Sequence, residues 1–87
     1  MEELRQFQKR IHETAKEKGW WDNPAPFGTR IALMHSELSE ALEADRHGNP
    51  SDDKIPEFSG IEAELADTMI RILDTAEADG LDVIGAM

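Results

Sequence analysis

The stretch IALMHSELSEALEADR, residues 31–46, decides the fold. Its apolar side chains recur every three or four residues, which is the period of an α-helix that buries one side. That stripe consists of Ile31, Met34, Leu38, Ala41 and Leu42. The helix is predicted to run from about Phe27, after two prolines, to Arg46, before the sequence GNP at 48–50.

The same period appears on both sides of this segment. Residues 2–18 repeat apolar side chains at helical spacing and are followed by Gly19, a residue suited to the end of a helix. Residues 59–79 open with a capping box made by Ser59 and Glu62. No segment shows the alternation of a strand, so the sequence predicts an all-α fold.

The helices are expected to form one small domain over residues 1–87. The last residues, LDVIGAM, are predicted to begin a fourth packed helix. The third helix is apolar on two sides, which favours burial between subunits. We therefore expect a small antiparallel bundle, with three main helices plus the start of a fourth, that is completed by dimerisation.

Composition restricts the partners of the chain. There are 19 acidic residues against 9 basic ones, which gives a net charge of −10. A surface of this charge repels nucleic acid polymers, whose binding depends on neutralising phosphates. The chain has no cysteine, no apolar run long enough for a membrane span and no apolar signal region at its start. We expect a cytoplasmic protein that binds neither membranes nor nucleic acid polymers.

Two acidic motifs stand out on the second and third helices. ELSE contains Glu37 and Glu40, and ELAD contains Glu64 and Asp67. In each motif, an acid precedes an apolar leucine and a second acid follows three residues later, so both acids project on one side of the helix.

The two motifs can meet if the helices pack against each other. Antiparallel packing through Leu38 and Leu65 would bring the four carboxylates to one edge of the contact. Carboxylates gathered in this way suit Mg²⁺ or Mn²⁺, and a further carboxylate, Glu37 or Glu40, can activate an attacking water. The alternative is that the acids of the two motifs lie on a solvated helix surface, where Asp67 pairs with Arg71 four residues later.

The acidic motifs resemble the signature of the all-α nucleoside triphosphate pyrophosphohydrolases of the MazG type. That signature has E-E-x-x-E on one helix and E-x-x-D on the next. Glu37 and Glu40 match the second and third acids of the first motif, and Glu64 and Asp67 match the second motif. Ser36 stands where many relatives have the first glutamate, so this sequence departs from the family pattern beside the metal site.

The resemblance spans most of the chain. IALMHSELSEALEADRHGN, IEAELADTMIRILDTAEADGLD and the KGWW turn all read like this family. The resemblance implies a helical bundle that forms dimers or tetramers and holds Mg²⁺ through the four acids. It also implies hydrolysis of nucleoside triphosphates between the α- and β-phosphates, which gives a nucleoside monophosphate and pyrophosphate and would serve nucleotide-pool cleaning.

Other side chains are candidates for contact with the nucleotide or the surroundings of the metal. A tryptophan can stack on the base, and cations can meet the triphosphate. The substrate candidates are Trp20, Trp21, Arg30, Lys54 and Arg71, and the candidates around the metal are Ser36 and Asp74. The alternatives are that the tryptophans pack in the core or the dimer interface and that the cations form surface ion pairs.

A non-enzymatic function is the alternative for the whole chain. The charge of −10 and the two-sided third helix also fit an acidic helical dimer that acts as a protein-interaction module for a basic partner. Such a module would not depend on a metal ion.

Overall fold

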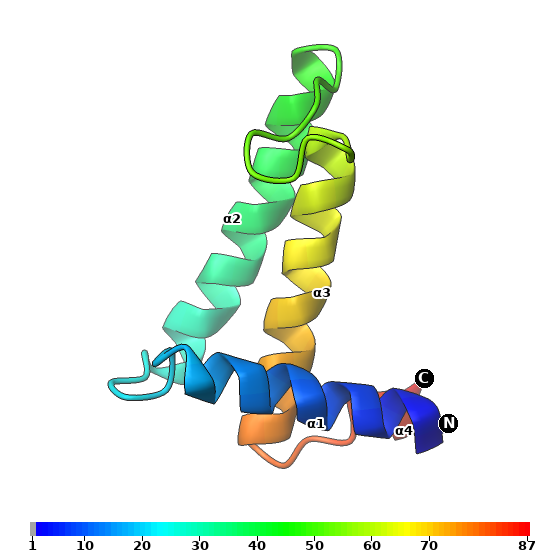
Figure 1. Cartoon of the computed structure of the whole chain (residues 1–87). Coiled ribbons are helices and arrows are strands. Elements are labelled where there is room, and N and C mark those ends of the chain that lie inside the picture. Colours follow the sequence, from blue (N-terminus) through cyan, green and yellow to red (C-terminus); the bar gives the residue numbers. More distant parts are fainter. Residues whose placement is uncertain (1) are drawn as a thin grey trace.

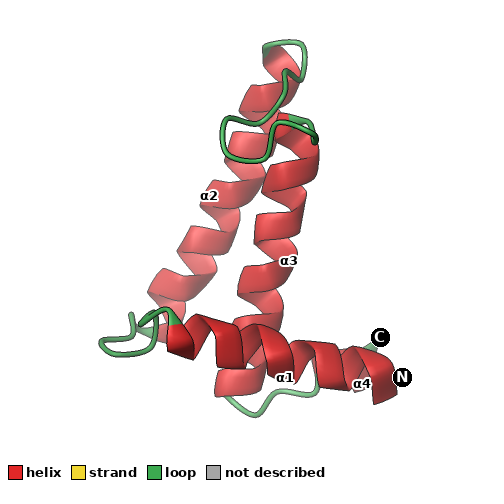
Figure 2. Cartoon of the chain, viewed as in Figure 1, coloured by secondary structure: helices red, strands yellow, loops and turns green. Residues whose placement is uncertain are grey.

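Three main helices and a short fourth make up the computed structural model, which describes residues 2–87. Helix α1 is Glu2–Glu17, α2 is Phe27–Arg46, α3 is Gly60–Ala78 and α4 is Val83–Ala86. The predicted all-α class is confirmed, since residues 2–87 contain no strand beyond one isolated bridge between two loop residues (Figure 2). None of the helices in this part of the chain has the length and apolar character that a membrane crossing requires.

Helices α2 and α3 form an antiparallel pair, and α1 crosses its lower end (Figure 1). The capping box is confirmed at the start of α3. Ser59 Oγ accepts the amide hydrogen of Glu62 at 3.1 Å, and Glu62 Oε1 accepts that of Ser59 at 2.9 Å. Gly19 follows α1 with a φ of 84°, a left-handed conformation that glycine adopts without strain. These local signals set the helix ends as the sequence predicted.

The two long helices approach closely at the start of α3. A Cβ atom at Gly60 would lie 3.0 Å from the Cβ of Ala44, so a larger residue there would force the helices apart. The loop closes on the same point. The Gly60 amide donates to the carbonyl of Pro50 at 2.7 Å, and the Ile61 amide donates to Asn49 Oδ1 at 2.9 Å. Small residues and loop hydrogen bonds therefore fix the register of the pair.

The expected packing of α2 on α3 through Leu38 and Leu65 is wrong within this chain. Leu38 is 47% exposed and Leu65 is 45% exposed. The buried residues of α2 are Glu37 and Ala41, which lie one turn apart and mark the side that α3 covers. Because successive residues are about 100° apart around a helix, Leu38 points away from that side and toward solvent.

Four exposed apolar side chains lie on one side of the α2–α3 pair, which we call the apolar face. It consists of Leu38, Leu42, Leu65 and Met69. Helix geometry places these residues on one side of the pair and the remaining acids of the two motifs on the other. Few large side chains are buried in the chain itself, and the four residues of the apolar face are each 45–62% exposed.

Helix α1 is joined to α3 by polar contacts. Gln8 Nε2 donates to Glu77 Oε1 at 3.0 Å, and His12 Nδ1 lies 2.7 Å from Asp74 Oδ1. The predicted fourth element is present as α4, whose Ile84 is buried. The crossing of α1 over α3 therefore combines these side-chain pairs with buried small apolar residues, Ala15 on α1 and Ala76 on α3.

Candidate metal centre

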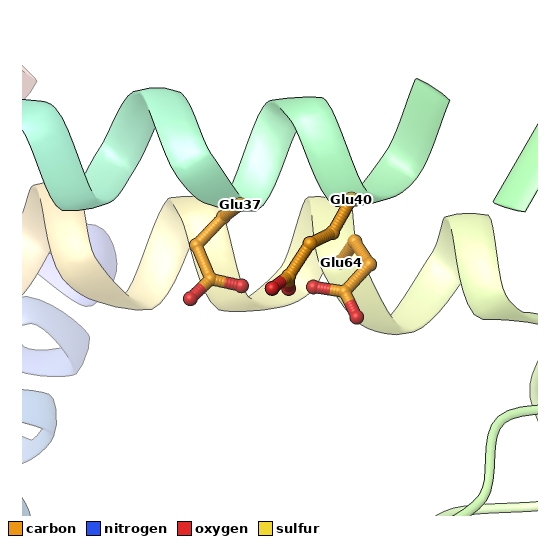
Figure 3. Close-up of side chains that lie close together, drawn as sticks. All are labelled: Glu37, Glu40 and Glu64. Carbon is orange, nitrogen blue, oxygen red and sulfur yellow. The ribbon is translucent and has the colours of Figure 1, made fainter. Parts of the chain in front are cut away.

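Three carboxyl groups meet where α2 lies beside the first half of α3. Glu37 and Glu40 come from α2 and Glu64 from α3, and each offers an oxygen atom within 4.8 Å of the other two. Figure 3 shows that the three carboxyl groups point into the same space. Mg²⁺ holds its oxygen ligands at about 2.1 Å, so the ligands of one ion lie within about 4.2 Å of one another. Small side-chain movements would therefore fit the three acids around one divalent cation.

Glu37 is the innermost member of this cluster. Its residue is only 9% exposed, and a charge buried to that degree needs a partner. Arg71 of α3 supplies one, because its Nε–H donates to Glu37 Oε1 at 3.0 Å. The expected surface pair between Arg71 and Asp67 is replaced by this contact between the two helices.

The surroundings of Glu64 disfavour the charged form of its carboxyl group. Its Oε2 is buried and has no hydrogen-bond partner among the described residues. Burial, followed by the neighbouring carboxyl groups of Glu37 and Glu40, raises the pKa of Glu64 to about 8. Without a cation, this carboxyl therefore keeps its proton at neutral pH, whereas a bound divalent ion would favour the charged form.

Asp67 lies in the same cavity but is not part of the three-carboxyl cluster. Burial and the charge of Glu37 raise the pKa of Asp67, and Arg71 partly opposes the shift. The structure therefore brings three of the four predicted metal ligands together and places the fourth one turn further along α3, facing the same space.

The cluster opens into a cavity of about 740 Å³, a volume in the range of small-molecule sites. Three cations and one tryptophan line this cavity beside the acids: Lys18, Lys54, Arg71 and Trp20. Lys54 is held there by its loop, since Asp52 Oδ2 accepts the amide hydrogens of Lys54 and Ile55 at 2.9 and 3.0 Å. We call this space the acidic cavity.

The two tryptophans have different environments. Trp21 is tied down, because its Nε1–H donates to both carboxylate oxygens of Asp74 at 2.9 and 3.0 Å and its ring meets His12 edge-on. Trp20 is 51% exposed and lines the acidic cavity. Only Trp20 of this pair presents its ring to that cavity.

The remaining predicted residues lie around the cluster rather than in it. Arg30 pairs with Asp79 at 3.1 Å and faces a second cavity of about 310 Å³ beside Trp21. Ser36 is exposed and its Oγ donates to the carbonyl of Leu33 at 2.7 Å. Neither Arg30 nor Ser36 lines the acidic cavity.

The buried group of His12, Trp21 and Asp74 was missed by sequence reasoning. His12 and Asp74 are 62 positions apart, so no local spacing connects them. Asp74 does not line the acidic cavity. Its hydrogen bonds instead join α1, the loop before α2, and α3 at one point.

No protein-family model, curated protein or solved structure matches the chain. The chemistry of the site is therefore argued from its own residues. Three converging carboxyl groups, a carboxyl that holds its proton in the absence of a cation, and a cavity lined by six acidic and three basic residues form a site suited to a divalent metal, which could in turn bind an anionic ligand.

Proposed function

We propose that the protein is a Mg²⁺-dependent nucleoside triphosphate pyrophosphohydrolase of the MazG type, with Mn²⁺ as an alternative metal. The observation that carries the proposal is the convergence of Glu37, Glu40 and Glu64 from two helices at one end of the acidic cavity. The products would be a nucleoside monophosphate and pyrophosphate, in keeping with nucleotide-pool cleaning.

The donor set fits a hard divalent cation. Carboxylate oxygens are the ligands that Mg²⁺ and Mn²⁺ prefer, and the unpartnered Oε2 of Glu64 supplies an oxygen that no residue of the described chain satisfies. Asp67 stands close enough in the cavity to complete or support the set. When bound, a divalent metal would supply positive charge that neutralises the charge developing on the phosphates.

Other functions of the reaction, namely water activation, phosphate binding and base stacking, are assigned to particular residues. Glu40 is the exposed acid of the cluster, so it is placed to orient a water and take its proton. Lys18 and Lys54 line the cavity on the route to the acids and can neutralise the triphosphate. Trp20 offers an open aromatic ring on which a base can stack.

A second copy of the chain is proposed to cover the apolar face. The chain exposes 6070 Å², whereas a monomeric protein of 9.8 kDa exposes about 5200 Å². The excess of about 900 Å² is close to the roughly 800 Å² that each partner buries in a standard interface. A dimer built on α2 and α3 would also leave the acidic cavity open, because the acids lie on the opposite side of the pair.

The test of the activity is a panel of ribonucleoside and deoxyribonucleoside triphosphates with detection of pyrophosphate. We expect Mg²⁺-dependent release from at least one substrate, and a loss of about 100-fold or more in Glu40→Gln, because the variant removes a proton acceptor from the reaction. Glu43→Gln is the matched control, since Glu43 is an exposed acid one turn along the same helix. Equal inactivity of wild type and Glu40→Gln on every substrate would refute the proposal.

The dimer is tested by sedimentation at several concentrations. Wild type is expected to sediment at twice the chain mass of 9.8 kDa, or at four times if two dimers associate. Leu65→Glu is expected to sediment as a monomer, because it places a charge in the centre of the buried apolar face. Leu4→Glu, an exposed leucine on α1, is the control. A wild-type monomer at all concentrations, or a dimer that survives Leu65→Glu, would contradict this assignment.

A further inference from the structure

Arg71 contacts the three-acid cluster and also lines two cavities. Its Nε–H is 3.0 Å from Glu37 Oε1, and this carboxylate belongs to the three-acid cluster. Its side chain is 37% exposed, so it is not enclosed by the fold. Arg71 lines both the acidic cavity and the cavity beside Trp21, which gives the side chain space to move.

A divalent cation and Arg71 compete for the same carboxylate. In the metal-free protein, the guanidinium of Arg71 is the partner of the buried Glu37 carboxyl group. A cation held by Glu37, Glu40 and Glu64 would bring two positive charges to the carboxyl group whose Oε1 Arg71 now contacts, and the two cations would repel each other. Binding of the metal therefore weakens the hold of Glu37 on Arg71.

Once released from Glu37, the guanidinium can bind a phosphate group. Its planar set of N–H donors matches the oxygens of a phosphate group, and the acidic cavity is the space in which the proposed substrate would lie. We propose that Arg71 is an exchange residue, which neutralises Glu37 in the metal-free protein and turns to the phosphate chain of the substrate once the metal is bound. This inference rests on the proposed function, because it assigns the metal and the triphosphate to the same site.

The exchange makes opposite predictions for the two ligands. In Arg71→Gln, Mn²⁺ is expected to bind about tenfold more tightly in the absence of phosphate, because a competing cation is gone. Inorganic tripolyphosphate is expected to bind the Mn²⁺-saturated variant about tenfold more weakly, because a cationic partner is gone. A residue that only stabilised the fold would not shift the two affinities in opposite directions.

The experiment uses isothermal titration calorimetry with the full chain. Mn²⁺ is titrated first, and inorganic tripolyphosphate is then titrated at saturating Mn²⁺, for wild type, Arg71→Gln and Arg71→Lys. Arg46→Gln is the matched control, because it removes the same charge from an exposed position on α2. Arg71→Lys is expected to keep part of the phosphate affinity through its charge and to lose the part that depends on the planar donors.

The outcomes separate the exchange from the proposed function. Opposite shifts in Arg71→Gln, with no shift in Arg46→Gln, support the exchange. Unchanged or weaker Mn²⁺ binding by Arg71→Gln, beside normal Mn²⁺ binding by wild type, overturns the exchange and leaves the metal centre intact. A wild-type protein that binds no Mn²⁺ overturns the metal centre and the exchange together.

Discussion

Glu64→Gln is expected to abolish stoichiometric Mn²⁺ binding and to change how the stability of the metal-free protein depends on pH. Glu64 is the one α3 residue of the three-carboxyl cluster, so the amide removes the ligand that joins the two helices through the metal. A loss of about 100-fold in metal affinity is the expected scale for one charged ligand of a small oxygen site. Calorimetry with Mn²⁺ measures it directly.

The pH effect follows from the raised pKa of Glu64. The ordinary value of a glutamate is 4.5, and the folded protein holds the Glu64 carboxyl at about 8. Between these two pH values the unfolded chain has lost the proton while the folded protein still keeps it, so the stability of wild type in chelator falls as the pH rises from about 4.5 to 8. Glutamine cannot ionise, so the part of this decline that Glu64 causes is expected to vanish in the variant.

Thermal melts in chelator at pH 5 and pH 8 test the second half of the prediction. Glu64→Gln is expected to melt at a higher temperature than wild type at pH 8 and to differ less at pH 5. Addition of Mn²⁺ is expected to raise the melting temperature of wild type alone. Glu43→Gln, an exposed acid outside the cluster, should behave as wild type in every arm.

The same measurements decide between the enzyme and the protein-interaction module. A module for basic partners needs the negative charge but not a metal, so it predicts no stoichiometric Mn²⁺ binding by wild type. Binding that Glu64→Gln abolishes would exclude the module. Equal Mn²⁺ affinity in wild type and Glu64→Gln would instead contradict the assignment of Glu64 as a ligand.

Local patterns in the sequence were enough to locate the helices. The period that predicts helix α2 and the capping box at Ser59 and Glu62 depend on residues within one or two turns, and the structure confirms the helix and the capping box. Helix periodicity also shows which side of a helix is apolar. It does not show what covers that side, and for this reason the predicted contact through Leu38 and Leu65 was wrong.

The close approach of α2 and α3 depends on small residues, which contribute little to a pattern of hydrophobic side chains. Gly60 lets Ala44 come near, and the buried side of α2 includes an acid, Glu37, that a reading based on hydrophobicity places at the surface. Leu38 and Leu65 are therefore available for a contact outside this chain. A sequence pattern cannot separate burial within one chain from burial between two.

The candidate site was predictable where its parts repeat a short spacing. The motifs ELSE and ELAD suggested that acids of two helices meet, and three of the four do so in the structure. The contact of Arg71 with Glu37 spans 34 positions and has no such spacing. Contacts of this kind follow from how the helices are rotated and shifted against each other, which only the folded structure contains.

Asp74→Ala is expected to destabilise the protein by about 3 kcal/mol, the scale for removing one partner of a buried charged group. Asp74 is buried and accepts hydrogen bonds from Trp21 while contacting His12. The substitution leaves these donors without a partner where α1, the loop before α2, and α3 meet. For a domain of this size, the melting temperature should fall by about 12–24 °C, measured at one protein concentration because a dimer would make it concentration-dependent.

The chain offers a matched control in its second acid–histidine pair. His47 Nδ1 lies 3.3 Å from Glu43 Oε1, and both side chains are well exposed, so Glu43→Ala should change the stability by less than about 1 kcal/mol. Below its melting temperature, Asp74→Ala is expected to bind Mn²⁺ as wild type does, because Asp74 lies outside the acidic cavity. A loss of Mn²⁺ affinity in the folded variant would place Asp74 in the surroundings of the metal, which is the role expected for it from the sequence. A melting temperature no lower than that of Glu43→Ala would show that the buried contacts of Asp74 do not hold the three segments together.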